Sequence, residues 1–137
     1  MAVIDLTTPY SLKNATLAIE ADDFTAAISQ VQFTPSTSTA TWRGIGGNVV
    51  KDQSKAEWSC TLAFAQDLAP SGLLRYLLEH DGEKKEVVFT PVASGPTVTA
   101  TLVVSPGDIG GTAGADLATS SVSLAVDGRP SFADPTP

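Results

Sequence analysis

The segment Lys55–Gln66 constrains the fold more than any other part of the chain. Its alternate positions divide into two sets, Trp58, Cys60, Leu62 and Phe64 against Ser59, Thr61, Ala63 and Ala65. Alternation with a period of two is typical of a β-strand. Because neither set contains a charge, we expect the strand to be covered on both sides.

Similar patterns recur along the chain and predict a mainly β protein. The expected strands are Asn14–Glu20, Phe24–Phe33, Lys84–Pro91, Thr97–Ser105 and Leu117–Val126. In the second of these the alternation slips near Ser29-Gln30, which predicts a β-bulge. The pair Asp22-Asp23 is expected to form a turn.

One helix is expected at about 70–81. Pro70 suits a first helical turn, and Asp81-Gly82 suits a helix end. Four leucines form an apolar stripe facing the sheet, namely Leu73, Leu74, Leu77 and Leu78. The helix is short and would close one open side of a β-sandwich.

Three segments do not fit the core pattern: an N-terminal arm at 1–12, a glycine-rich loop at about 43–56 and a C-terminal tail at 128–137. We therefore predict one domain over 1–137, with the β core and helix at 13–127. The expected fold is a β-sandwich or barrel-like domain with one short flanking α-helix and extended N- and C-terminal arms. The stretch Pro106–Gly114 is expected to be a further loop.

The chain is acidic, with 15 Asp and Glu against 8 Lys and Arg and a formal charge of −7. This charge argues against tight nucleic-acid binding, although it suits a wall that DNA slides past. With the single cysteine Cys60, no internal disulfide is possible. We see neither a signal peptide nor a membrane-spanning stretch, so synthesis in a cytoplasm is expected.

No residue pattern supports catalysis. The glycine stretches 44–47 and 107–114 lack the Lys-Ser/Thr of a phosphate-binding P-loop, so flexible loops are the better interpretation. His80 lacks an identifiable nucleophile and is assigned to the helix end, where it would complement the helix dipole. Cys60 alternates with core residues and is expected to be an inert, buried thiol.

The acidic clusters also lack the pattern of a site. Asp22-Asp23, Asp81/Glu83/Glu86 and Asp108/Asp116 have neither calcium-loop spacing nor an aromatic sugar platform. We therefore predict no enzyme activity, no cofactor and no metal. Trp58 is assigned to the core, whereas Trp42 is either a loop-edge residue or a contact with another chain.

The order of these elements resembles the major tail tube proteins of long-tailed, siphovirus-type bacteriophages. The segments that carry the resemblance are TWRGIGGNV at 41–49, EWSCTLAFAQD at 57–67, GLLRYLLEHDGEKKEVVFTP at 72–91, TATLVVSPGDIGGTAG at 99–114 and SSVSLAVDGRPSF at 120–132. The resemblance implies subunits that form hexameric rings, which stack into a tube through which DNA is ejected. It also implies a location in the virion, with the chain itself, the tape measure, tail tip and tail terminator proteins as partners and DNA as non-specific cargo.

Two sets of residues follow as candidates within such a tube. The first would contact neighbouring subunits: Val3, Ile4, Leu6, Tyr10, Trp42, Arg43, Ile45, Val49, Val50, Ile109 and Phe132. The second would face the lumen: Thr97, Thr99, Thr101, Ser121 and Ser123. Strands 97–104 and 120–126 carry no charge, so their edges suit pairing with another chain.

Two alternatives remain open. One is a monomeric immunoglobulin-like or carbohydrate-binding β-sandwich module, which would need exposed aromatic residues. The other is the tube protein of a contractile tail or a secretion-type injection system. The sequence does not decide between a flexible and a contractile tail.

Overall fold

The computed structural model describes residues 2–20, 22–114 and 116–134, so Met1 of the arm and 135–137 of the tail lie outside the described residues. The elements are β1 (Thr16–Ile19), β2 (Asp22–Asp23), the 3-10 helix η1 (Thr25–Ala27), β3 (Ile28–Ser36), β4 (Thr39–Arg43), β5 (Val49–Gln53), β6 (Glu57–Ala65), α1 (Leu73–Glu79), β7 (Lys84–Thr90), β8 (Thr97–Val103), β9 (Thr119–Val126) and β10 (Ser131–Ala133).

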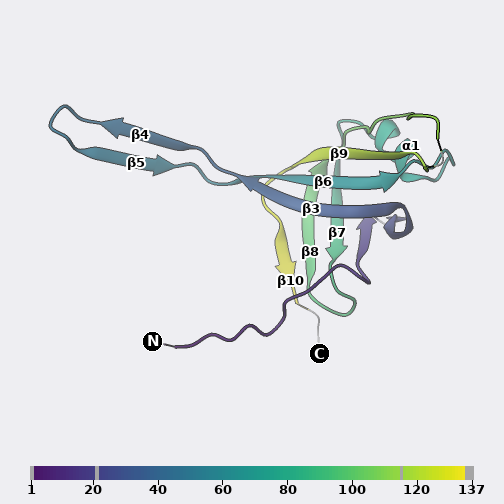
Figure 1. The fold of residues 1–137 in the computed structure, drawn as a ribbon, viewed down its shortest axis with the longest axis horizontal. Helices are drawn as coiled ribbons and strands as arrows, with labels where there is room; N and C mark the ends of the chain where they lie inside the picture. Colours follow the sequence, from purple (N-terminus) through teal and green to yellow (C-terminus); the bar gives the residue numbers. More distant parts are fainter. Residues whose placement is uncertain (1, 21, 115, 135–137) are drawn as a thin grey trace.

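Eight of the strands form one antiparallel sheet. Its order is β2-β1-β7-β8-β9-β6-β3, and β10 pairs with β8 outside this order. β8 and β9 pair only through Leu102 with Val126 and Val103 with Ala125, so the sheet can fold over at this point. In Figure 1, β3, β6 and β9 run across β7 and β8, which gives two crossed layers.

The hydrophobic core lies between these layers. One layer contributes Cys60, Leu62 and Phe64 of β6, with Leu124 of β9 beside Cys60, and the other layer contributes Leu102 of β8. The helix closes one side with three buried leucines, Leu73, Leu74 and Leu77. The predicted mainly β, sandwich-like fold with one short helix is therefore confirmed.

Near the N-terminus, the predicted bulge is confirmed and two other details change. The register between β3 and β6 shifts between Ile28 and Gln30. Asp22 and Asp23 form β2, paired with Ile19 and Ala18 of β1, rather than a turn. Residues 25–27 form η1, so the strand predicted from 24 begins only at Ile28.

The helix is shorter than predicted at both ends. The Asp67 carboxylate accepts a hydrogen bond from the Ala69 N–H at 3.0 Å, and the Gly72 N–H donates to the Ala69 carbonyl, so a turn precedes the helix. A Cβ at Gly72 would lie 2.9 Å from the Asp67 carbonyl oxygen. Leu78 is 52% exposed, so its assignment to the apolar stripe was wrong.

The prediction of a long loop at 43–56 was also wrong. β4 and β5 form an antiparallel hairpin in which Trp42 lies opposite Val50 and Arg43 opposite Val49. All ten strand residues are exposed, so no inward-facing stripe marked the hairpin in the sequence. In Figure 1 this hairpin projects far from the rest of the domain.

Two further features differ from the sequence-based expectation. Residues 131–133 of the predicted tail form β10, which pairs with β8. Ser131 lies opposite Thr99, and Ala133 lies opposite Thr97. The second side of the strand Lys55–Gln66 is only half-buried, because no further layer of the described chain covers it. Complete cover on both sides was therefore wrong.

Candidate interaction surface

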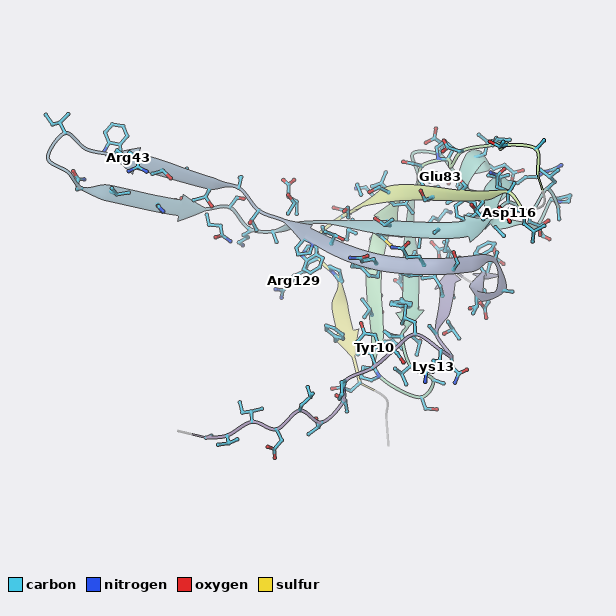
Figure 2. All side chains as sticks on the ribbon, viewed as in Figure 1. Tyr10, Lys13, Arg43, Glu83, Asp116 and Arg129 are labelled. Carbon is cyan, nitrogen blue, oxygen red and sulfur yellow. The ribbon has the colours of Figure 1, made fainter. Side chains whose placement is uncertain are left out.

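Exposed apolar side chains gather on two segments that project from the domain. In the N-terminal arm they are Val3, Ile4, Leu6 and Tyr10, between 65% and 93% exposed. In the β4–β5 hairpin they are Trp42, Ile45, Val49 and Val50, between 47% and 111% exposed. Figure 2 shows both segments as extensions with side chains pointing into open space. An exposed apolar set of this size marks an interaction surface.

The hairpin extends the β3–β6 ladder beyond the domain. The Ser54 N–H donates to the Ser38 carbonyl at 2.9 Å, which joins the two ladders. At its tip the Gly44 N–H donates to the Asn48 carbonyl at 2.9 Å, and Gly47 has a φ of 89°. A Cβ at Gly44 would lie 2.0 Å from the Asn48 side-chain oxygen. The glycines that suggested a loop are therefore those that a tight turn requires.

The two faces of the hairpin differ. Directly opposed residues share a face, so Trp42 and Val50 form an apolar pair on one side. The other side carries Arg43 beside Val49, and Lys51 opposite Thr41. Both cations of the hairpin therefore lie on the same face.

A groove of about 710 Å³ separates the arm from the sheet. Arm residues 7–10 line one wall, and Phe33, Trp58, Val92 and Phe132 are among the residues of the other. Trp58 is half-buried here and is absent from the core cluster, so its assignment to the core was wrong. Sequence alternation placed Trp58 on the inward side of β6 but could not show that the core ends before it.

The opposite end of β6 carries a loop that a single side chain holds in place. The Gln66 side-chain amide donates to the carbonyls of Gly110, at 2.8 Å, and Thr119, at 3.0 Å, while its oxygen accepts from the Gly110 N–H at 2.9 Å. The amide thus acts as an extra peptide unit. The held loop exposes Ile109 at 64% and Leu117 at 85%. Sequence patterns identified Ile109 but missed Gln66, Gly110 and Leu117.

The outer faces of the two layers have different chemistry. On the face of β3, β6 and β9 that points away from the core, most positions hold hydroxyl, amide or methyl groups: Gln30, Gln32, Thr34, Ser59, Thr61, Ala63, Ser121, Ser123 and Ala125. The one charged residue on this face is Glu57, opposite Ser36 at the end of the ladder next to the hairpin. On the other layer, Lys84 and Glu86 share their outer face with Val88 of β7 and Thr101 of β8.

The residues predicted to face a lumen are divided between these faces. Ser121 and Ser123 are exposed on β9. Thr97, Thr99 and Thr101 alternate with the buried Val98, Ala100 and Leu102 and lie outward on β8. Since β8 and β9 pack in different layers around the same core, the structure does not bring the two groups together.

Titratable groups form local contacts rather than a reactive centre. The pKa of Glu83 is lowered, chiefly because its carboxylate is hydrogen-bonded to His80 Nδ1 at 2.8 Å. His80 also packs against Tyr76, with ring centroids 4.4 Å apart and the two rings tilted by 45°. Burial raises the pKa of Cys60 to about 12, as expected for an inert core thiol.

Between 2–20, 22–114 and 116–134, no three His, Cys, Asp or Glu side chains lie close enough to hold a metal ion. The described chain also contains no helix with the length and apolarity to cross a membrane.

Comparison of sequences finds no relative: no protein-family model matches the chain, and no curated protein matches it. Comparison of structures finds the same fold over nearly the whole chain. A chain from the sheath/tube terminator of the extracellular contractile injection system PVC, in its extended state, superposes with a TM-score of 0.67 and 14% identity, covering 94% of this chain and 99% of its own.

Two more structures show the same likeness. A chain of the PVC sheath-tube complex in its extended state has a TM-score of 0.67 and 15% identity, covering 92% of both chains. A chain from the tail of an empty GTA particle, refined with C6 symmetry, has a TM-score of 0.62 and 17% identity, covering 87% of this chain and 93% of its own. The protein shares the fold of components of tail-like particles.

Proposed function

We propose that this chain is a structural, non-catalytic subunit of a tail-type tube, in which copies of the chain form rings and the rings stack. The observation that carries the proposal is the β4–β5 hairpin, which places Trp42, Ile45, Val49 and Val50 outside any core that one chain can build. A two-stranded hairpin is marginal alone in water. Neighbouring subunits would cover these side chains and stabilise it.

The likeness to tail components adds independent support, because it extends over 87% to 94% of this chain in the three structures above. A hexameric ring agrees with the C6 symmetry of the GTA tail. The proposal includes tubes of long-tailed, siphovirus-type bacteriophages and tubes of contractile systems. A tape measure protein, a tail tip and a tail terminator would be the further partners, and the virion or tail-like particle would be the location.

We assign the outer face of β3, β6 and β9, on which Glu57 is the single charged residue, to the channel. Ser121 and Ser123 belong to this face, while Thr97, Thr99 and Thr101 would then point away from the channel. A wall of hydroxyl and amide groups with one carboxylate offers no cations to phosphate, so DNA would pass without binding tightly. The charged residues of the other layer would lie on the outside of the tube.

A second candidate function is a terminal ring that ends the tube. It is favoured by the PVC terminator chain, 99% of which is covered by this fold. A tube subunit stacks on its own copies without limit, because a head-to-tail contact that does not close produces a filament. A terminal ring would instead remain a single ring in isolation.

The experiment is negative-stain microscopy and size-exclusion chromatography of the purified protein over a wide concentration range. Stacked rings support the tube subunit, and single rings that never stack support the terminal ring. The matched variants are Val50→Ser in the hairpin and Leu78→Ser on α1, a side chain of similar exposure outside the hairpin, the arm and the groove. We expect the first to reduce assembly more than the second. A monomer at every concentration that binds a glycan array would instead support the carbohydrate-binding module.

A further inference from the structure

The two ends of the long β3–β6 ladder have opposite chemistry. At one end the hairpin 39–53 carries Arg43 and Lys51 against the single acid Asp52. At the other end, the segments 66–69 and 106–118 carry Asp67, Asp108 and Asp116 and no Lys or Arg. Figure 2 labels Arg43 on the projecting hairpin and Asp116 at the far side of the domain.

Both ends also expose apolar side chains next to these charges. Ile45 forms the hairpin tip, and Val49 shares the face of Arg43. At the other end Ile109 and Leu117 lie in the loop that carries Asp108 and Asp116, with Leu68, 71% exposed, beside Asp67. Apolar contact ringed by complementary charge is the usual composition of a specific interface.

The loop at the acidic end is ordered within the single chain. Gln66 makes three hydrogen bonds to the loop, all between 2.8 and 3.0 Å. Gly110 has a φ of 108°, which a residue with a side chain rarely adopts. A loop that is ordered before binding loses less conformational entropy when a partner docks.

We propose that the hairpin of one copy docks head to tail on the Gln66-held loop of a second copy. Arg43 and Lys51 meet the carboxylates of Asp67, Asp108 and Asp116, and Ile45 and Val49 pack on Ile109 and Leu117. The occupant is a second copy because, within one chain, the hairpin and the loop project from opposite ends of the domain (Figure 1). Such a contact uses two different surfaces and therefore repeats without closing.

This inference rests on the proposed function and identifies the contact that would stack successive rings. It also predicts polarity, because every ring would present hairpins on one side and acidic loops on the other. Salt would weaken the stack by screening the exposed charges.

Charge reversal in wild-type and variant full-length chains tests the contact. Arg43→Glu is expected to raise the protein concentration needed for stacking by about tenfold or more. Arg129→Glu is the matched control, since Arg129 is also exposed but lies outside both the hairpin and the acidic loop (Figure 2). Adding Lys51→Glu, Asp108→Arg and Asp116→Arg to the Arg43→Glu chain should restore stacking, because both hairpin cations and both loop carboxylates then have reversed signs.

Crosslinking gives a second readout that does not depend on charge. A chain with Ile45→Cys and Ile109→Cys should form a ladder of covalent multimers under mild oxidation, whereas either single variant should not. Native Cys60 does not interfere because it is fully buried.

The outcomes separate the two proposals. If wild-type chains stack but neither rescue nor a covalent ladder is seen, the docking contact is overturned while the tube function stands. If wild-type chains form only single rings, the docking contact between copies is overturned and the terminal ring gains support. If wild-type chains never assemble, the proposed function fails, and the docking contact with it.

Discussion

Two β-hairpins of this protein have the same secondary structure and opposite surroundings. β7 and β8 alternate buried with half-buried or exposed residues and place Val87, Phe89, Ala100 and Leu102 in the core. β4 and β5 have ten exposed residues and pair only with each other among the strands of the described chain. The first hairpin is therefore stabilised by folding of its own chain, whereas the second has apolar side chains that only another molecule can cover. This difference separates the residues that maintain the fold from those available for assembly.

The largest effect should come from the buried hairpin. Leu102→Ala removes a side chain that is 1% exposed, and we expect the free energy of unfolding to fall by about 3 kcal/mol because a cavity remains. Urea denaturation of the unassembled protein measures it. A loss close to that of an exposed valine would contradict the assignment of β8 to the core.

A smaller effect is expected at the loop that Gln66 holds. Gln66→Ala removes three hydrogen bonds and should lower the free energy of unfolding by about 1 kcal/mol. Hydrogen exchange at the Gly110 amide should become faster, because its acceptor is lost. Gln53→Ala, on the exposed strand β5, serves as control and should leave that amide unchanged. Unchanged Gly110 protection in Gln66→Ala would show that the loop does not depend on this side chain.

Substitutions in the exposed hairpin should hardly change the stability of the unassembled chain. Val50→Ala is expected to change the free energy of unfolding of unassembled protein by less than about 0.5 kcal/mol, because the side chain is 57% exposed. Its effect should appear only when chains assemble, as a higher concentration required for ring or tube formation. A large loss of stability in the unassembled protein would mean that the hairpin packs on its own domain.

The smallest effect concerns pH at the turn that follows β2. The pKa of Asp23 is lowered, first by the hydrogen bond from the Thr25 hydroxyl and second by the Thr25 N–H at 2.9 Å. A depressed carboxyl pKa contributes stability above the unfolded value, and this contribution is lost as pH falls through the folded value. Thr25→Val removes the hydroxyl donor and should raise the pKa of Asp23 in an NMR titration. Thr41→Val, on the exposed hairpin, should leave it unchanged.

The sequence predicted the elements whose side chains face a common core. β6, β8 and β9 were identified because a buried face imposes an apolar residue at every second position. The bulge near Ser29 was visible because an extra residue reverses that alternation. The exposed, apolar inter-subunit candidates were identified for the opposite reason, as side chains that fit no core pattern.

Only the tertiary structure determined how the exposed segments are arranged and which residues lie on a common face. The segment 43–56, which holds the hairpin turn and β5, was predicted as a loop because strands exposed on both faces need no alternation, and its glycines suit a tight turn as well as a loop. The hydrogen bonds between the Gln66 side chain and Gly110 join residues 44 positions apart, and no local sequence pattern encodes them. The separation of Ser121 and Ser123 from Thr97, Thr99 and Thr101 likewise depends on which strands share a layer. Alternation thus determines which residues must be buried, whereas the folding of the sheet at β8–β9 determines where the remaining faces point.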